Sequence, residues 1–357
     1  MLPQKYLFYL NLVFNFITKE IFAREIKTPS SHIRKDLSLH ATKKIKIYFY
    51  SIAFTAGTNV VIADMIPELI KRIKQSSLPW DVTFSMAPPK IKVDYLICFK
   101  SLPPKKIIGN PKIFLSICDE GENFWQYLKK FDALVASSSE KFAKLISLKN
   151  RKTYFITESE NFTNINFGSK NLKNLPSKRS CNLFWHGLPN SFGALLKLKP
   201  YLIKLSENKK FNLLVVSGKK AMHKYKWGEI TVSHYPWSEE NMRKCAKISQ
   251  LGIIPARSSL RTSYLKPASR IRVLYALGVP SIGYSSVPDL IKFNSFFGGP
   301  AARSEKEFAD KINYLLAHPK ILNEVALNGF KCVKDFYSIK NSANQWVNLI
   351  YEHEMNK

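Results

Sequence analysis

Positively charged side chains gather in one short stretch of the chain. Five cations fall within sixteen residues that contain no acidic side chain: Arg257, Arg261, Lys266, Arg270 and Arg272. A segment with helical spacing of its apolar residues begins inside this stretch. Cationic side chains beside the amino end of a helix favour a diphosphate, because both supply positive potential and hydrogen-bond donors. The stretch therefore predicts a site for a phosphorylated ligand, with a solvated basic loop as the alternative.

Glycines follow two predicted strands where a phosphate could approach the backbone. The strand expected at 182–186 is followed by Gly187, and the strand expected at 211–217 is followed by Gly218 and Lys219. In open α/β sheets, ligands bind beyond the carboxyl ends of the strands, against loops of this kind. Neither loop has a G-x-G-x-x-G or P-loop pattern, so neither of those phosphate sites is indicated.

Three side chains are candidates for acid–base chemistry. Asp119 and Glu120 follow the strand expected at 112–117, where a carboxylate could orient or deprotonate a hydroxyl group. Acidic residues are also common at the amino end of a helix, and a helix is expected directly afterwards. His186 ends its strand, and it is either a ligand contact or a structural histidine. Both alternatives stay open for all three residues.

No metal site is predicted. The seven histidines and five cysteines have neither His-Glu-x-x-His nor Cys-x-x-Cys spacing. The odd number of widely separated cysteines indicates reduced, buried thiols, as in a cytosolic protein.

Strand-like and helix-like segments alternate along the chain. Strands are expected at 45–50, 80–85, 93–99, 112–117, 132–137, 153–157, 182–186, 211–217, 230–234, 251–255 and 279–283. Helices are expected at 59–75, 123–131, 139–148, 192–207, 239–245, 271–277, 305–317, 320–336 and 341–354. Repeated strand-then-helix order is typical of parallel sheets with helices on both faces. The sequence therefore predicts an α/β fold.

The polar segment 158–179 has no sustained periodicity and is the expected boundary between two domains. A length of 357 residues suits two domains of ordinary size. The expected parts are an N-terminal apolar helix with a linker, two α/β domains, and a C-terminal helix that can return to the first domain: 1–44, 45–170, 171–337 and 338–357. Two such domains in sequence predict a ligand cleft between them.

The N-terminal segment has apolar residues at helical spacing: Leu7, Leu10, Phe14, Ile17 and Ile21. Other apolar residues fill its remaining faces, so such a helix must be buried in something. We expect it to pack on the protein's own surface or to lie in the plane of a membrane interface. Asn11 and Asn15 interrupt the apolar run, and no stretch has 18 uninterrupted apolar residues. Neither a signal peptide nor a membrane-spanning helix is therefore predicted.

The chain is strongly basic, with 55 Lys and Arg against 26 Asp and Glu and a formal net charge of +29. Such a charge attracts nucleic acid, an anionic membrane or phosphorylated ligands, although scattered lysines can also reflect composition alone. Basic pairs such as Lys43–Lys44, Lys105–Lys106 and Lys129–Lys130 do not extend into longer runs, and no nucleic-acid-binding motif is visible. Nucleic acid is therefore not the expected partner.

One segment carries a resemblance to a known family. KPASRIRVLYALGVPSI, at 266–282, resembles the donor-site helix of the GT-B glycosyltransferases, in which a K-x-x-x-R approach precedes an E-A-x-x-x-G-x-P turn. Four other segments are similar to parts of that family: SICDE at 116–120, DALVASS at 132–138, LFWHG at 183–187 and YPWSEENM at 235–242. The resemblance covers about 45–350 and is most specific around Gly278 to Pro280.

The resemblance implies a GT-B fold, with two Rossmann-like domains facing a central cleft and a helical C-terminal tail. It implies donor-binding residues at Gly187, Lys219, Arg257, Lys266, Arg270, Val273 and Gly278, and catalytic candidates at Asp119, Glu120 and His186. The implied donor substrate is a nucleotide-diphosphate sugar, without a permanently bound cofactor and without a metal. The implied acceptor is a glycan or lipid-linked saccharide in surface polysaccharide synthesis. A cytoplasmic enzyme touching the inner face of an anionic membrane would suit such an acceptor.

One departure from the family pattern concerns the donor ribose. Many retaining members have two glutamates eight residues apart in this region, and the corresponding positions here are Leu265 and Val273. Neither side chain can accept a hydrogen bond. Diphosphate binding is therefore better supported than ribose recognition, and a GT-B-like protein that binds a nucleotide or glycan without turnover is the main alternative. A basic nucleic-acid-binding protein is a weaker one.

Overall fold

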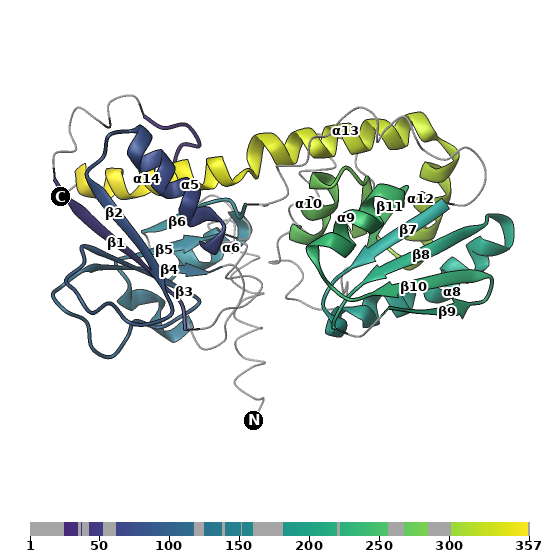
Figure 1. Ribbon diagram of the computed structural model, residues 1–357, viewed down its shortest axis with the longest axis horizontal. Helices are drawn as coiled ribbons and strands as arrows, with labels where there is room; N and C mark the ends of the chain where they lie inside the picture. Colours follow the sequence, from purple (N-terminus) through teal and green to yellow (C-terminus); the bar gives the residue numbers. More distant parts are fainter. Residues whose placement is uncertain are drawn as a thin grey trace. The chain divides into compact units, whose positions relative to one another are not determined.

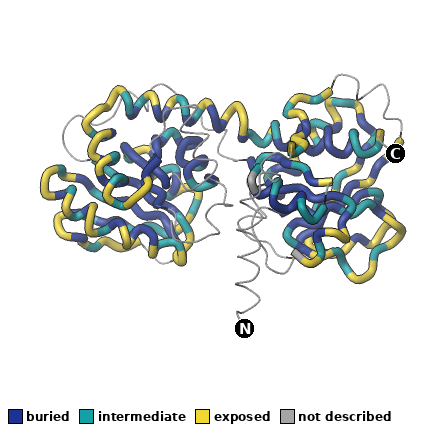
Figure 2. Tube along the Cα trace, turned by 180° about the vertical axis from the view of Figure 1, so that it is seen from behind, coloured by how far each residue is buried: buried dark blue, intermediate teal, exposed yellow. Residues whose placement is uncertain are grey.

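The computed structural model describes residues 25–34, 37, 43–52, 62–117, 125–137, 140–150, 152–159, 181–219, 222–255, 268–284 and 301–355. The chain forms two compact units (Figure 1). Unit 1 consists of Met1–Ser159 together with Ile339–Lys357, and unit 2 consists of Glu160–Ser338. Each unit has its own sheet and its own buried core, seen as the dark interior of each in Figure 2.

Unit 1 contains a six-stranded parallel sheet with strand order β2-β1-β3-β4-β5-β6. Its strands are β1 (Ile45–Tyr50), β2 (Trp80–Ser85), β3 (Tyr95–Phe99), β4 (Lys112–Ile117), β5 (Ala133–Ala136) and β6 (Thr153–Phe155). The central strand β3 is buried at every residue, as expected of a strand covered on both faces.

Two helices cover one face of this sheet: α5 (Met65–Gln75) and α14 (Ile339–Met355). Ile47 and Phe49 point from β1 into the same core as Leu69 of α5 and Trp346 of α14. Further helical segments in the described part of unit 1 are the 3-10 helix η2 (Trp125–Lys130) and α6 (Glu140–Ser147). The C-terminal helix α14 is therefore part of the first unit's core.

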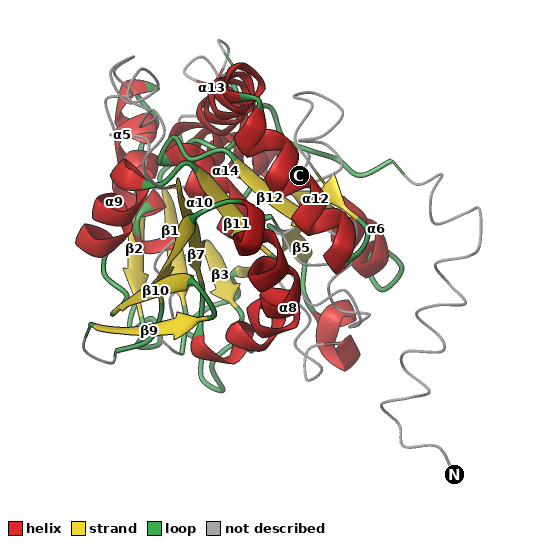
Figure 3. Cartoon of the chain, turned by 90° about the vertical axis from the view of Figure 1, so that its right-hand side faces the viewer, coloured by secondary structure: helices red, strands yellow, loops and turns green. Residues whose placement is uncertain are grey.

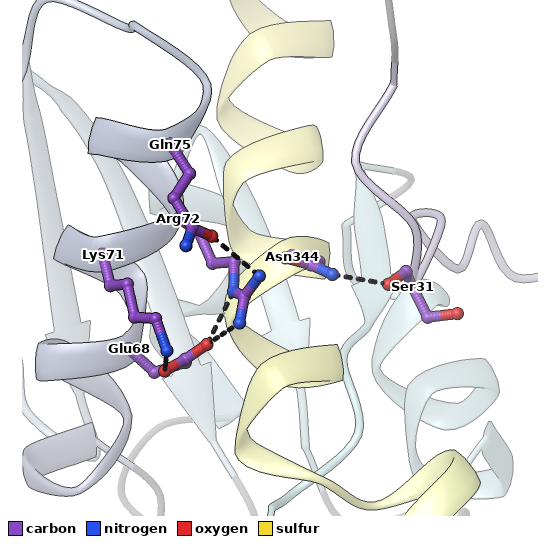
Figure 4. Close-up of polar contacts among 6 residues, drawn as sticks. All are labelled: Ser31, Glu68, Lys71, Arg72, Gln75 and Asn344. Carbon is purple, nitrogen blue, oxygen red and sulfur yellow. Dashed lines mark hydrogen bonds and ion pairs between the residues drawn. The ribbon is translucent and has the colours of Figure 1, made fainter.

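Polar side chains fasten α14 to the segment near the start of the described chain. Asn344 donates to the carbonyl oxygen of Ser31 at 2.8 Å, and Asn348 donates to those of Ser30 and His32, both at 2.8 Å. Figure 4 shows α14 between this segment and α5, whose Arg72 pairs with Glu68. Segments that lie far apart in the sequence of unit 1 thus pack against each other through α14.

Unit 2 contains a seven-stranded sheet with strand order β13-β12-β11-β7-β8-β10-β9. Its strands are β7 (Cys181–His186), β8 (Phe211–Val216), β9 (His223–Trp227), β10 (Ile230–Tyr235), β11 (Leu251–Ile254), β12 (Ser281–Tyr284) and β13 (Ala301–Ala302). All neighbouring strands are parallel except β9, which runs antiparallel to β10 at the sheet edge.

Helices lie on both sides of the strands of unit 2 (Figure 3). They are α8 (Phe192–Asn208), α9 (Glu239–Ile248), α10 (Ser269–Ala276), α12 (Glu305–Ala317) and α13 (Pro319–Phe336), with the 3-10 helix η4 (Pro189–Ser191) before α8. Helix α8 packs against α12, and α10 packs against α13. Gly329 of α13 permits the second contact, because a Cβ there would meet the Tyr275 ring at 2.1 Å.

Most expected elements are present, with some differences. The helix expected at 123–131 is the 3-10 helix η2, and strands β9 and β13 were not predicted. The helix expected at 59–75 is an α-helix from Met65, and residues 53–61 lie outside the described part. The helix expected at 7–21 also lies outside it.

The described helices and cysteines bear on two further expectations. Within the part that the structure describes, no helix is both long and apolar enough to cross a membrane. Cys98, Cys245 and Cys332 are buried, whereas Cys181 is half-buried.

Candidate functional site

The second sheet reverses its strand order at β7. The chain runs from β7 through β8 to β10 on one side and then crosses to β11 on the other side of β7. The carboxyl ends of β7 and β11 therefore lie next to each other at the switch point, on the edge of the sheet that the strand ends form. His186 ends β7 and Ile254 ends β11. This switch point is the position at which doubly wound sheets bind ligands.

Gly187 lets the backbone beyond β7 approach a side chain from α10 closely. A Cβ added to Gly187 would lie 3.0 Å from Nη1 of Arg270 and 3.1 Å from the Trp185 ring. The Gly187 amide donates to the carbonyl oxygen of Val216 at 3.2 Å, which extends the β7–β8 ladder by one step. Any larger residue at 187 would press against the guanidinium group.

Arg270 brings a buried positive charge to this edge. The residue as a whole is half-buried, but its Nη1 is shielded from solvent and has no hydrogen-bond partner among the described residues. Burial lowers the pKa of Arg270 to about 10, so the guanidinium stays protonated at neutral pH. A buried cation with an unused donor is costly unless an anion pairs with it.

His186 links the end of β7 to the start of α10. Its Nε2 lies 2.9 Å from the carbonyl oxygen of Arg270, and its side chain is 6% exposed. Burial lowers the pKa of His186 to about 4, although the hydrogen bond to Arg270 opposes this shift. The ring is therefore neutral at pH 7, and Nε2 must carry the proton that it donates to the carbonyl. His186 thereby holds the first turn of α10, and with it Arg270, against the strand end.

The other predicted residues on or next to α10 have structural roles. Arg272 is 1% exposed, and its guanidinium lies over the Tyr337 ring at 4.6 Å, so it belongs to the core and not to the cationic edge. Val273 packs against the apolar core of unit 2. Gly278 has a φ of 78° and ends the helix, with its amide donating to the Tyr275 carbonyl at 2.9 Å and the next amide to the Leu274 carbonyl at 2.8 Å. These bonds form a Schellman cap, which requires the left-handed conformation that glycine adopts without strain.

The loop after β8 meets the same edge. Gly218 has a φ of 62°, and a Cβ there would lie 3.3 Å from Cγ of Pro189. Its carbonyl oxygen accepts a 2.7 Å hydrogen bond from the Trp237 amide, which follows β10. Lys219 is exposed at the end of this loop. The structure thus brings Gly187, Arg270 and the loop carrying Lys219 to one edge of the sheet.

Sequence reasoning missed the aromatic side chains at this edge. His223 of β9 and His234 of β10 have ring centroids 4.7 Å apart, and His234 Nε2 lies 3.1 Å from the carbonyl oxygen of Ser217. Trp237 is 57% exposed. The available signal was the alternation in HKYKW at 223–227, which predicts an edge strand that would place these histidines side by side.

The remaining predicted site residues lie outside the described part of the chain: Asp119, Glu120, Arg257, Leu265 and Lys266. The roles of these residues stay predictions. Among the described residues, no group of three or more His, Cys, Asp or Glu could hold a metal ion.

Comparison with solved structures identifies the fold. A glycosyltransferase from Rickettsia africae ESF-5 is similar at 14% identity and a TM-score of 0.60, and sucrose-phosphate synthase from Thermosynechococcus elongatus at 11% identity and 0.63. HepE from Anabaena, solved in complex with UDP and glucose, is similar at 9% identity and 0.60. Each alignment covers 88% of this chain and 100% of the other. No family model matches the sequence, and no curated protein matches it.

These neighbours are GT-B glycosyltransferases, and the chain shares their fold. The prediction of a GT-B fold, with Rossmann-like units built on parallel sheets and a helical C-terminal stretch, is confirmed.

Proposed function

We propose that this protein is a hexosyltransferase-like glycosyltransferase that uses a nucleotide-diphosphate sugar as donor substrate. The acceptor would be a glycan or lipid-linked saccharide in surface polysaccharide synthesis, at the inner face of a membrane. The observation that carries the proposal is the solvent-shielded Nη1 of Arg270, which has no partner among the described residues and lies at the switch point beside Gly187.

A diphosphate suits this arrangement better than a neutral ligand. Its oxygens can accept from the Arg270 guanidinium, which a Cβ at position 187 would otherwise crowd. When the bond to the sugar breaks, negative charge grows on the leaving diphosphate. A fixed cation in a dry site stabilises that charge more than the ground state. Arg257, Lys266 and Lys219 are proposed to add to this cationic environment.

Further roles follow for the predicted residues. We propose that His186 acts through Arg270 by holding α10 in place, because its Nε2 is already engaged with the Arg270 carbonyl. Asp119 and Glu120 are proposed to orient or deprotonate the acceptor hydroxyl. The complexes of HepE with UDP and with UDP-glucose support a donor of this chemical class.

A binding protein without turnover is the second candidate, and Val273 favours it. The side chain at this position is apolar and packs against the core, so it supplies no acceptor for a ribose hydroxyl. In that case the nucleotide would still bind through Arg270, but no sugar would be transferred.

Thermal unfolding with a panel of UDP, GDP and ADP tests the proposal. A nucleotide that binds the folded state stabilises it by about 2.7 kcal/mol at 100 times its Kd. Replacing Arg270 by Met should abolish this stabilisation, whereas Arg243→Met, which removes a half-buried arginine paired with Glu239, should leave it intact. Release of sugar from the bound donor then separates a transferase from a binding protein. The proposal fails if no nucleotide diphosphate stabilises the protein while single-stranded or duplex nucleic acid does.

A further inference from the structure

Two connections in unit 1 join parallel strands without a helix. Residues 86–94 lead from β2 to β3, and residues 100–111 lead from β3 to β4. The Tyr48 hydroxyl donates to the carbonyl oxygen of Ala87 at 2.9 Å. Tyr48 alternates along β1 with Ile47 and Phe49, which face α5 and α14, so it points to the opposite face of the sheet. The first connection therefore lies over the face that α5 and α14 leave uncovered, as Figure 1 also shows.

The two connections carry the same short pattern. MAPPKIK at 86–92 and LPPKKII at 102–108 both place Pro-Pro-Lys before isoleucine. Their large apolar side chains are 40–55% exposed: Met86, Ile91, Leu102 and Ile108. Paired prolines fix φ and limit the conformations of each loop, so these apolar groups are presented to solvent by a stiffened backbone. Clustered exposed apolar side chains of this kind mark an interaction surface.

The same loops are strongly basic. Exposed lysines lie between the apolar residues: Lys90, Lys92, Lys105 and Lys106. From 82 to 111 the sequence contains one acidic residue, Asp94, and its Oδ2 accepts a 2.8 Å hydrogen bond from the Lys46 amide. The exposed apolar groups are therefore surrounded by positive charge with little to neutralise it.

The two loops also touch each other. Gly109 has a φ of 83°, and a Cβ there would lie 3.1 Å from Cγ of Lys92. The backbone of the second loop thus rests on the side chain of the first. Residues 86–92 and 102–110 together form one surface, which we call the basic–apolar loop pair.

We infer that the basic–apolar loop pair docks on an anionic membrane surface. Exposed apolar side chains enter the boundary between headgroups and acyl chains, while flanking lysines are attracted to anionic headgroups. The charges are complementary, since the loops carry four exposed lysines and the surface of such a membrane is negative. Because the loops enter the headgroup region already stiffened, little conformational entropy is lost on docking. This inference does not depend on nucleotide binding by Arg270.

Co-sedimentation with vesicles tests the inference. The full chain should bind phosphatidylcholine vesicles in which about a third of the lipid is the anionic phosphatidylglycerol. It should bind pure phosphatidylcholine weakly, and added salt should release it. Each lysine near an anionic surface contributes about fivefold to binding. The double variants Lys90→Gln with Lys92→Gln, and Ile91→Ser with Ile108→Ser, should each lower binding by roughly 10-fold or more.

Matched controls come from unit 2. Lys224→Gln with Lys226→Gln removes two exposed lysines of β9, and Leu196→Ser with Leu327→Ser removes two exposed leucines. These changes should lower vesicle binding by less than about threefold, because they leave the loop pair intact. All variants should keep the wild-type melting temperature and the response to nucleotide, which shows that the fold and the proposed donor site are unchanged.

Three results would overturn the inference. One is equal loss of vesicle binding in the unit 2 controls, which would show general attraction by the net charge. Another is loss on removing residues 1–24 with none in the loop variants, which would assign binding to the N-terminal segment. The last is loop-dependent binding to nucleic acid or an acidic polysaccharide without binding to vesicles. Hydrogen exchange should otherwise show protection at 86–92 and 102–110 on anionic vesicles.

Discussion

The switch points of the two sheets differ in how their polar groups are satisfied. In unit 1, strand order reverses between β1 and β3, and there the Ser101 hydroxyl accepts from the Ile52 amide at 3.0 Å and donates to the Phe99 carbonyl at 2.8 Å. In unit 2, the corresponding edge keeps the Nη1 of Arg270 without a partner among the described residues. The described polar groups of the first edge are paired with each other, whereas the second edge keeps a buried donor without a described partner. Strand order alone therefore makes both switch points candidate ligand sites. The unpaired buried charge distinguishes the one in unit 2.

Replacing Arg270 by Met should change nucleotide affinity and stability more than any other substitution proposed for these two edges. Loss of a charged partner in a buried ion pair costs about 2 to 5 kcal/mol, so affinity for a nucleotide diphosphate should fall by roughly 30-fold or more. The free protein should become more stable, by about 1 to 3 kcal/mol, because a buried charge without a partner is removed. Titration calorimetry and urea unfolding measure the two effects. Unchanged affinity would mean that the anion site lies elsewhere.

His186 should make the second unit sensitive to acid. Its pKa of about 4 in the folded protein lies below the usual 6.5, so the unfolded chain binds the extra proton between these values. Stability from this group is present above pH 6.5 and is lost as the pH falls to 4, for a total of about 3 kcal/mol. The variant His186→Gln should lack this part of the pH dependence in urea unfolding. If wild type and variant lose stability in parallel, the histidine is not held neutral.

Adding a methyl group at Gly187 should disturb the strand-end edge of unit 2 less than the changes at Arg270 and His186 do. The new Cβ would meet the Arg270 guanidinium at 3.0 Å and the Trp185 ring at 3.1 Å, so one of them must shift. Gly187→Ala should lower stability by about 1 to 3 kcal/mol and weaken nucleotide binding roughly tenfold. Gly109→Ala in unit 1 is a control for stability alone, and nucleotide affinity should not change in it.

Removing the Ser101 hydroxyl should have the smallest effect and should confine it to unit 1. Ser101→Ala leaves the Ile52 amide without its acceptor, which costs about 1 kcal/mol of stability. Nucleotide affinity should stay at the wild-type value by calorimetry. A loss of affinity in this variant would contradict the contrast between the two edges.

The sequence predicted the strands well because most are short, apolar runs buried on both faces. Strands β1, β2 and β4 begin and end at the predicted residues. Strand β9 was missed because His223, Lys224 and Lys226 give it no apolar run, and its place at the sheet edge permits exposed polar side chains. The alternation in HKYKW is a weak signal by itself, and pairing with β10 makes this segment a strand.

The site was harder to predict than the fold. The sequence alone does not distinguish Arg270 from Arg272, because both are cations near the start of the same helix. They differ in the structure because successive helical residues project about 100° apart, and Arg272 meets Tyr337, 65 residues further on. Gly278 was the most recognisable part of the pattern, and its geometry is that of a helix cap. The motif residues thus mark a segment, while burial and unsatisfied hydrogen bonding distinguish Arg270 within it.

The place of α14 in unit 1 has a consequence for biosynthesis. Unit 2 is one continuous stretch, so all its residues have been made while the ribosome is still adding residue 339 and beyond. Unit 1 starts first, but its core includes Trp346, and its segment near Ser30 is held by Asn348. A nascent chain cannot complete this packing until α14 has left the exit tunnel. The half of the protein that is translated first is therefore the half that matures last, and premature termination at residue 338 would leave it open.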